Sequence, residues 1–238
     1  MPAARAIIRK LESVFALTPE ERQVIESLPV QFRDAKAGET IVREGDRPSQ
    51  CCVVLSGLGC RFKIVEDGHR QIMSFQMSGD LPDLQSLHLD VMDHDIGMLR
   101  AGKVAFVPHA AVHAMNANHP RIAAALWRNT LIDAAIFRQW MVGIGSKSAY
   151  GRVAHLLCEL AVLAEAVGLS QQSLEHTPNQ GEIGDALGLS VVHVNRTLRA
   201  LREDGLIAAG RRIPILDREG LQSAGEFDPA YLHLRKAV

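Results

Sequence analysis

The chain has 238 residues, of which 47% are hydrophobic and 22% charged, and its formal net charge is −1. This composition provides enough apolar material for one large or two modest domains and excludes a disordered tail protein. No run of about 18 apolar residues and no signal-peptide pattern is present, so we expect a cytoplasmic protein without a membrane partner.

Residues 3–108 predict two short helices followed by a β-rich region. Within residues 3–28, Thr18 occupies an N-cap position, Pro19 the first helical position, and Glu21 lies three residues after the cap. From about residue 30 to residue 108, short apolar runs alternate with turn signals such as Asp67-Gly68. Short strands at this spacing are typical of an antiparallel sandwich or barrel.

A long helix is predicted from about Pro120 to about residue 145, and a further helix ends at Gly168. The long helix has apolar residues on more than one face, so it requires burial on two sides. We interpret one side as packing on its own domain and the other as packing on a partner chain. The candidate dimer-interface residues are Leu126, Ile136, Phe137, Trp140 and Ile144.

Residues 180–207 have the pattern of a helix-turn-helix. A first helix over Gln180–Leu187 is followed by Gly188, which permits a sharp turn, and Ser190 can cap the second helix. Val194, Leu198 and Leu201 recur at helical spacing and are expected to dock that helix. The arginine-bearing segment that follows, residues 208–221, resembles a two-stranded wing.

The second helix has the residue types of a DNA-reading helix. Arginine suits guanine, asparagine suits adenine, and valine can contact a thymine methyl group. We expect Arg196 to read a base, and Arg199, Arg211 and Arg212 to hold phosphates. Taken alone, the pattern also fits an ordinary helical hairpin with solvated arginines. The candidate DNA contacts are Ser190, Val191, Val192, His193, Asn195, Arg196, Arg199, Arg211 and Arg212.

The order of these parts resembles the Crp/Fnr superfamily of bacterial transcription regulators. The most specific pieces are GEIGDALGLSVVHVNRTLRALREDGLI and AGETIVREGDRPSQCCVVLSG. The resemblance implies an α+β fold with three parts: an antiparallel β-roll of the cyclic-nucleotide-binding type with N-terminal helices (1–118), a dimerisation helix (119–146) and a winged helix-turn-helix (147–238). It further implies a non-enzymatic homodimer that binds a palindromic operator in double-stranded DNA, with RNA polymerase as another partner.

Two departures from the family pattern affect specificity and sensing. Val192 stands where the family often has an acidic residue, so we expect a different operator. The candidate effector pocket is the turn with Gly79, Asp80, Leu81 and Asp83, and no Arg or Lys lies between Arg70 and Arg100. Since a phosphate requires donors and positive charge, we expect no response to cyclic AMP. The alternative is that cyclic AMP does bind, with its phosphate held by Arg70, Arg100 or an arginine of a partner subunit.

The remaining sensor chemistries leave the cofactor unknown. The family's iron–sulfur members carry an N-terminal cysteine cluster, whereas the first cysteine here is Cys51. Adjacent Cys51 and Cys52 should point to opposite faces of a strand. Inert thiols are expected, with a redox switch as the alternative. His109 and His113 could share a helix face as metal ligands but lack a visible third ligand. The remaining cysteines are Cys60 and Cys158.

Two rival functions follow from the same residues. A cupin-like metalloenzyme would require a His-x-His pair, which the β-rich segment does not contain. A cyclic-nucleotide-binding-like module whose helical tail docks proteins would show no salt-dependent DNA binding.

Overall fold

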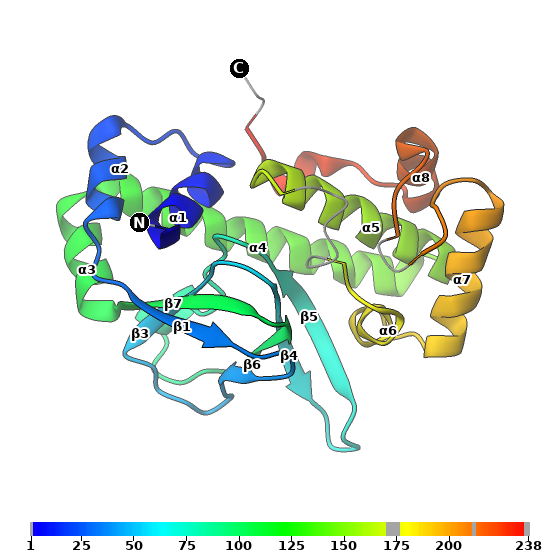
Figure 1. Cartoon of the computed structure of the whole chain (residues 1–238), viewed down its shortest axis with the longest axis horizontal. Coiled ribbons are helices and arrows are strands. Elements are labelled where there is room, and N and C mark those ends of the chain that lie inside the picture. The colour runs from blue at the N-terminus through cyan, green and yellow to red at the C-terminus, as the bar shows by residue number, and fades with distance from the viewer. Residues whose placement is uncertain (1, 170–176, 211–212, 236–238) are drawn as a thin grey trace.

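The computed structural model describes residues 2–169, 177–210 and 213–235. A β-roll and a group of C-terminal helices lie at opposite ends of the long helix α4 (Pro120–Ser146) (Figure 1). None of the described helices has the length and hydrophobicity needed to cross a bilayer.

Two helices, α1 (Pro2–Glu12) and α2 (Pro19–Glu26), precede the roll. The predicted start of α2 is confirmed. The Thr18 hydroxyl accepts a hydrogen bond from the backbone N–H of Glu21 at 3.2 Å, and the Glu21 carboxylate accepts one from the N–H of Thr18 at 2.7 Å. This reciprocal capping box satisfies two helix-terminal donors.

The predicted antiparallel β domain is confirmed as two sheets. One sheet has the order β1-β7-β3 and the other β2-β6-β4-β5. Strand β3 confirms the prediction for the two adjacent cysteines, because Cys51 and Cys52 pack into different hydrophobic clusters. The strands are β1 (Gln31–Ala35), β2 (Thr40–Val42), β3 (Gln50–Val54), β4 (Leu58–Ile64), β5 (Arg70–Gln76), β6 (Asp95–Arg100) and β7 (Gly102–Pro108).

The loop between β5 and β6 contains the 3₁₀ helix η1 (Leu84–Leu87), and α3 (His109–Asn118) leads from β7 to α4. Helix α5 (Ala149–Ala166) follows α4 and supports the helix-turn-helix. A single hydrophobic cluster joins the two ends of the molecule. It includes Leu58 and Ile72 of the roll, Leu156 of α5, and Leu198 of the helix-turn-helix. The helix-turn-helix half therefore packs directly against the β-roll of the same chain.

The C-terminal helices are α6 (Gln180–Leu187), α7 (Val191–Glu203), α8 (Arg218–Gly225) and the 3₁₀ helix η3 (Pro229–Leu232). The predicted two-stranded wing is reduced, within the described residues, to one antiparallel bridge between Ile207 and Ile215. Arg211 and Arg212 lie outside the described residues, so their predicted phosphate contacts have no structural description.

Candidate nucleic-acid interface

The turn between α6 and α7 is built as the sequence predicts. Asn179 caps α6 through a reciprocal pair of hydrogen bonds with Glu182. Gly188 ends the helix with φ of 64°, a left-handed conformation that favours glycine. Gly184 permits the close approach of the turn, because a Cβ atom there would lie 2.5 Å from the carbonyl oxygen of Leu189. The two helices are therefore fixed relative to each other by backbone geometry.

Helix α7 presents one face to the core and the opposite face to solvent. The Ser190 hydroxyl caps it by accepting a hydrogen bond from the N–H of His193 at 3.2 Å. The predicted docking residues Val194, Leu198 and Leu201 are fully buried, as expected. Positions 192, 196 and 199 follow the i, i+4, i+7 spacing of one helix face and are all exposed.

The outer face combines free and bonded side chains. Val192 is 79% exposed and Val191 is 54% exposed. Among the described residues, none accepts a hydrogen bond or ion pair from the exposed Arg196. Asn195, in contrast, donates to the side-chain oxygen of Gln180 at 3.1 Å. The valines and Arg196 are thus available to a ligand without breaking an intrachain contact.

Three further candidate DNA contacts are Arg199, Ser190 and His193, each of which is engaged with, or partly covered by, its own chain. The Arg199 guanidinium donates to the Glu203 carboxylate at 2.8 Å, an exposed i,i+4 pair that contributes little to stability. The Ser190 hydroxyl serves as the helix cap, and the His193 side chain is half-buried. Arg199 can therefore exchange its partner for a phosphate at small cost.

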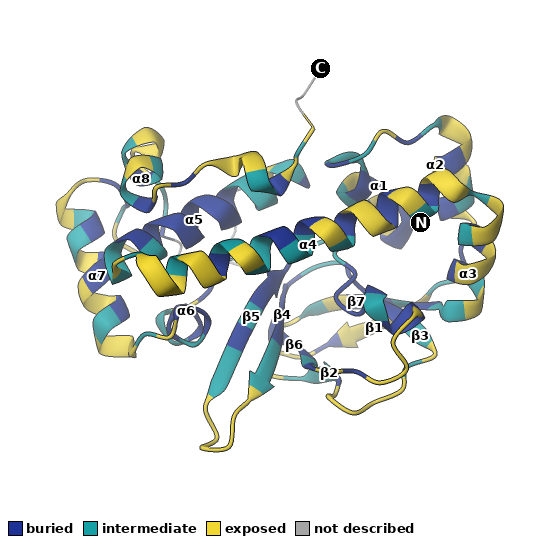
Figure 2. Cartoon of the chain, turned by 180° about the vertical axis from the view of Figure 1, so that it is seen from behind, coloured by how far each residue is buried: buried dark blue, intermediate teal, exposed yellow. Residues whose placement is uncertain are grey.

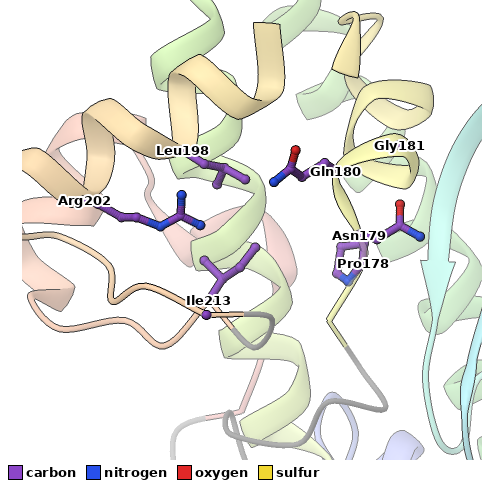
Figure 3. Close-up of a pocket in the computed structure, with 8 residues that line it drawn as sticks. Pro178, Asn179, Gln180, Gly181, Leu198, Arg202 and Ile213 are labelled. Atoms are coloured by element: carbon purple, nitrogen blue, oxygen red, sulfur yellow. The ribbon is translucent and has the colours of Figure 1, made fainter. Parts of the chain in front are cut away.

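A cavity of about 390 Å³ lies where the start of α6 meets α7 and the segment that follows α7. Figure 3 shows Arg202 and Gln180 extending toward this space from opposite sides. The Nε atom of Arg202 is buried and has no hydrogen-bond partner within the part of the chain that the structure describes. The sequence alone predicts no role for Arg202. Its position, one helical turn after the buried Leu198, places it at the edge of the inner face of α7, and this spacing is the signal that could have identified it.

In the structure, most of the expected dimer-interface residues of α4 contact their own chain. Leu126 and Trp140 are buried within their own chain, and the Trp140 indole donates to Glu159 of α5 at 2.8 Å. Ile136 is half-buried against the same core, and Phe137 lies near Arg61 of the roll. These four side chains are committed to intrachain packing, whereas Ile144 is exposed.

A different stripe of α4 is exposed along the length of the helix (Figure 2). Trp127 is 64% exposed, Met141 is 73% exposed, and Leu131 is also exposed. With the half-buried Ala134 and the exposed Arg138, their positions alternate by four and three residues, the spacing of a coiled-coil seam. We call Trp127, Leu131, Ala134, Arg138 and Met141 the α4 seam. Periodicity alone did not separate this seam from the intrachain face, because both faces are apolar.

The candidate effector turn is filled by intrachain contacts. The Asp80 carboxylate forms an ion pair with Lys10 of α1 at 2.6 Å and accepts a hydrogen bond from the N–H of Met77. A Cβ atom on Gly79 would lie 2.4 Å from the carbonyl oxygen of Ala6, so α1 covers the turn. Asp83 is fully buried and accepts from the N–H of Cys52 at 2.8 and 2.9 Å. Burial raises the pKa of Asp83 to about 7.

Arg61 of β4 supplies the positive charge that the turn itself lacks. Its side chain is only 6% exposed and forms an ion pair with Asp133 of α4 at 2.9 Å. Its Nε donates to the carbonyl oxygen of Pro82 at 2.7 Å. The space left beside these groups is about 30 Å³, enough for one or two water molecules, whereas ligand pockets measure about 300–1,000 Å³.

The two arginines that the sequence offered as alternative phosphate ligands bind the helix-turn-helix instead. Arg70 pairs with Asp185 at 2.8 Å, and Arg100 makes a bidentate contact with Glu182 at 2.7 and 2.8 Å. Gln71 donates to the carbonyl oxygen of Ala186 at 3.2 Å. Strands β5 and β6 of the roll thereby hold helix α6.

The candidate metal-binding histidines contact one another through their rings, and the cysteines are buried. His113 makes edge-to-face ring contacts with His88 and His109. Within residues 2–169, 177–210 and 213–235, no group of three or more His, Cys, Asp or Glu side chains could hold a metal ion. All four cysteines are free and buried, and burial raises the pKa of Cys60 and of Cys158 to about 12. Buried thiols of this kind react slowly.

Comparisons with known proteins agree with this architecture. Residues 32–119 match the cyclic nucleotide-binding domain, and residues 151–224 match the Crp-like helix-turn-helix domain. The transcriptional activator protein Anr of Pseudomonas aeruginosa is 28% identical over 203 residues, which cover 85% of this chain and 83% of that protein. The transcriptional activator protein FnrA of Stutzerimonas stutzeri is 27% identical over 207 residues, covering 87% and 85%.

The fold is shared with a solved structure. FixK2 from Bradyrhizobium japonicum aligns with a TM-score of 0.74 at 23% sequence identity, covering 83% of this chain and 98% of that one. The two domain matches, the named relatives and the shared architecture lead to one conclusion. The chain belongs to the Crp/Fnr superfamily of transcription regulators, with a cyclic nucleotide-binding-type domain followed by a Crp-like helix-turn-helix DNA-binding domain.

Proposed function

We propose that this regulator acts in the cytoplasm as a homodimer that places two copies of α7 in successive major grooves of a palindromic operator. The single observation that carries this proposal is the exposed Arg196, which has no partner among the described residues and lies beside Val192 on the outer face of a capped and firmly docked helix. A free guanidinium can make the bidentate contact with guanine that is the commonest base-specific contact in protein–DNA complexes.

The α4 seam is the proposed dimer interface. Its large side chains, Trp127 and Met141, are exposed on a different face of α4 from the one that packs on its own chain. Pairing two copies along this stripe would remove apolar surface from water and satisfy both sides of α4. Ile144, which is exposed near the C-terminal end of the same helix, can extend the contact.

Phosphate contacts are assigned to the arginines around α7. Arg199 can leave its exposed ion pair with Glu203, and Arg202 faces the cavity beside the first amides of α6. Arg211 and Arg212 are proposed, as in the sequence analysis, to contact phosphates as well. Such contacts fix the position of the protein on DNA and carry no sequence information directly.

We further propose that cyclic AMP is not the effector. The Arg61–Asp133 pair joins the roll to α4, and Lys10 neutralises Asp80 within the same chain. A cyclic phosphate would have to displace an ion pair and then lie among carboxylates. RNA polymerase is proposed as the second macromolecular partner, because the named relatives are transcriptional activators.

The test is selection of binding sites from random DNA, followed by affinity measurements on the selected operator. Arg196→Ala should weaken operator binding by about 1–3 kcal/mol and relax discrimination at one position of each half-site. Arg199→Ala is the matched control, since it should weaken operator and random DNA alike and reduce the salt dependence. Equal losses on operator and random DNA for both variants would contradict the assignment.

A further inference from the structure

The N-terminal tip of α7, formed by its first two residues, Val191 and Val192, is apolar. Val191 and Val192 are both more than half exposed, and neither side chain belongs to a hydrophobic cluster of the described residues. The first turn contains no acidic residue, and its capping hydroxyl, that of Ser190, is bonded to the backbone. The leading end of the helix therefore offers methyl groups and has few free acceptors.

We propose that Val192 reads the C5-methyl group of a thymine in each half-site, with Val191 completing the apolar surface around it. This inference rests on the proposed function, in which α7 enters the major groove. Thymine is the base whose major-groove edge carries a methyl group, and apolar side chains are its natural partners. Val192 is the primary contact, because it lies on the same helix face as Arg196.

The spacing within α7 sets the position of this thymine. Val192 and Arg196 are four residues apart, which corresponds to a rise of about 6 Å along the helix. Stacked base pairs are separated by about 3.4 Å. The methyl-sensitive thymine should therefore lie one or two base pairs from the guanine that depends on Arg196.

The same tip discriminates against cytosine. Cytosine presents an N4 amino donor in the major groove, and glutamate or aspartate is the usual acceptor for it. Here Val192 occupies the tip, and the Ser190 hydroxyl already accepts from the N–H of His193. A cytosine at this position would lose the methyl contact and leave a buried donor without a partner.

The experiment replaces single thymines of the selected operator with deoxyuridine, which removes only the methyl group. Affinities are measured by fluorescence polarisation with wild-type protein, Val192→Ala and the neighbouring control Val191→Ala. Burial of one methyl group corresponds to about a four-fold change in Kd, and substitution in both half-sites to about sixteen-fold. We expect this loss at one thymine per half-site, one or two base pairs from the Arg196-dependent guanine.

The variants locate the contact. Val192→Ala should bind the thymine and deoxyuridine operators nearly equally, whereas Val191→Ala should keep most of the difference. In an operator with cytosine at this position, 5-methylcytosine should recover part of the affinity for wild-type protein. Val192→Thr, which keeps one methyl group, provides a second measurement, and thermal melting checks that each variant is folded.

The remaining outcomes overturn the inference in distinguishable ways. Tight operator binding with no deoxyuridine effect at any thymine would overturn methyl reading and leave the proposed function intact. A deoxyuridine effect that persists unchanged in Val192→Ala would remove the assignment to Val192. Absence of sequence-specific DNA binding by the wild-type protein would overturn the proposed function and, with it, this inference.

Discussion

The β-roll and the helix-turn-helix use arginine in opposite ways. In the roll, Arg61 is buried, and its guanidinium is bonded to Asp133 and to the carbonyl oxygen of Pro82. On α7, Arg196 is exposed and has no partner among the described residues. A buried charge requires such partners, whereas an exposed one does not. The buried charge of the roll is thus satisfied within the chain, by α4 and the effector turn, whereas Arg196 is available for the DNA contact that we propose.

The helix α4 connects these two regions, so breaking its seam should produce the largest effect. Met141→Glu places a charge on the most exposed apolar residue of the seam and should yield monomers. Because two linked half-site contacts gain about 10²–10⁴-fold in affinity, we expect operator binding to fall by at least about 100-fold. Analytical ultracentrifugation and DNA binding measure the two effects.

Ile64→Glu is the matched control for the seam. Ile64 is also exposed and apolar, but it lies at the end of β4 in the hairpin, away from α4. The Ile64→Glu protein should remain a dimer with unchanged operator affinity. A Met141→Glu protein that sediments as the wild-type dimer would remove the seam from the interface.

The contrast between the two arginines predicts effects on stability of very different size. Arg61→Ala should lower the free energy of unfolding by about 3 kcal/mol, because it leaves Asp133 and buried carbonyl groups without their donor. Arg196→Ala should change it by less than about 0.5 kcal/mol, as expected for an exposed side chain without contacts. Urea denaturation of both variants measures the difference. Similar values for the two would break the comparison.

A buried carboxyl group at the junction of α4 and α5 predicts a pH-dependent stability. Glu159 accepts hydrogen bonds from Trp140 and Tyr231, and burial raises its pKa to about 7. The unfolded chain has the ordinary glutamate pKa of about 4.3. The raised value therefore gives stability that is complete below the unfolded pKa and is lost as the pH rises through about 7.

Glu159→Gln isolates this contribution. Between pH 5 and pH 8, the free energy of unfolding of wild type relative to Glu159→Gln should fall by about 2 kcal/mol. His155, whose pKa burial lowers, and Lys147 lie in the same network and are present in both proteins. Glu66→Gln makes the same chemical change in the exposed hairpin turn and should follow the wild-type curve. Parallel curves for wild type and Glu159→Gln would contradict the prediction.

Local sequence patterns predicted the helix-turn-helix well, because its cap at Ser190, its turn at Gly188 and its docking residues are all set within one short segment. The interior of the roll depends on distant partners. Arg61 approaches the effector turn from β4, and Lys10 reaches Asp80 from α1. Inspection of residues 71–99 alone could not reveal either charge. For α4, both faces are apolar, and tertiary contacts such as the packing of Trp140 on α5 separate the intrachain face from the seam.

Addition of cyclic AMP tests whether the β-roll can accept a ligand, and we expect no measurable effect on operator affinity. A cyclic phosphate that enters beside Gly79 would lose hydration and meet Asp80, which is already neutralised by Lys10, and Asp83, which is bonded to the backbone. The buried Arg61 is held by Asp133 and by the carbonyl oxygen of Pro82, and releasing it would leave Asp133 without its ion-pair partner. Calorimetry at micromolar cyclic AMP should therefore give no binding heat, and operator affinity should not change. Micromolar binding with tighter operator binding would show instead that Arg61 exchanges Asp133 for the phosphate. In that case Arg61→Met should abolish the response, whereas Asp133→Asn should strengthen it by freeing the guanidinium.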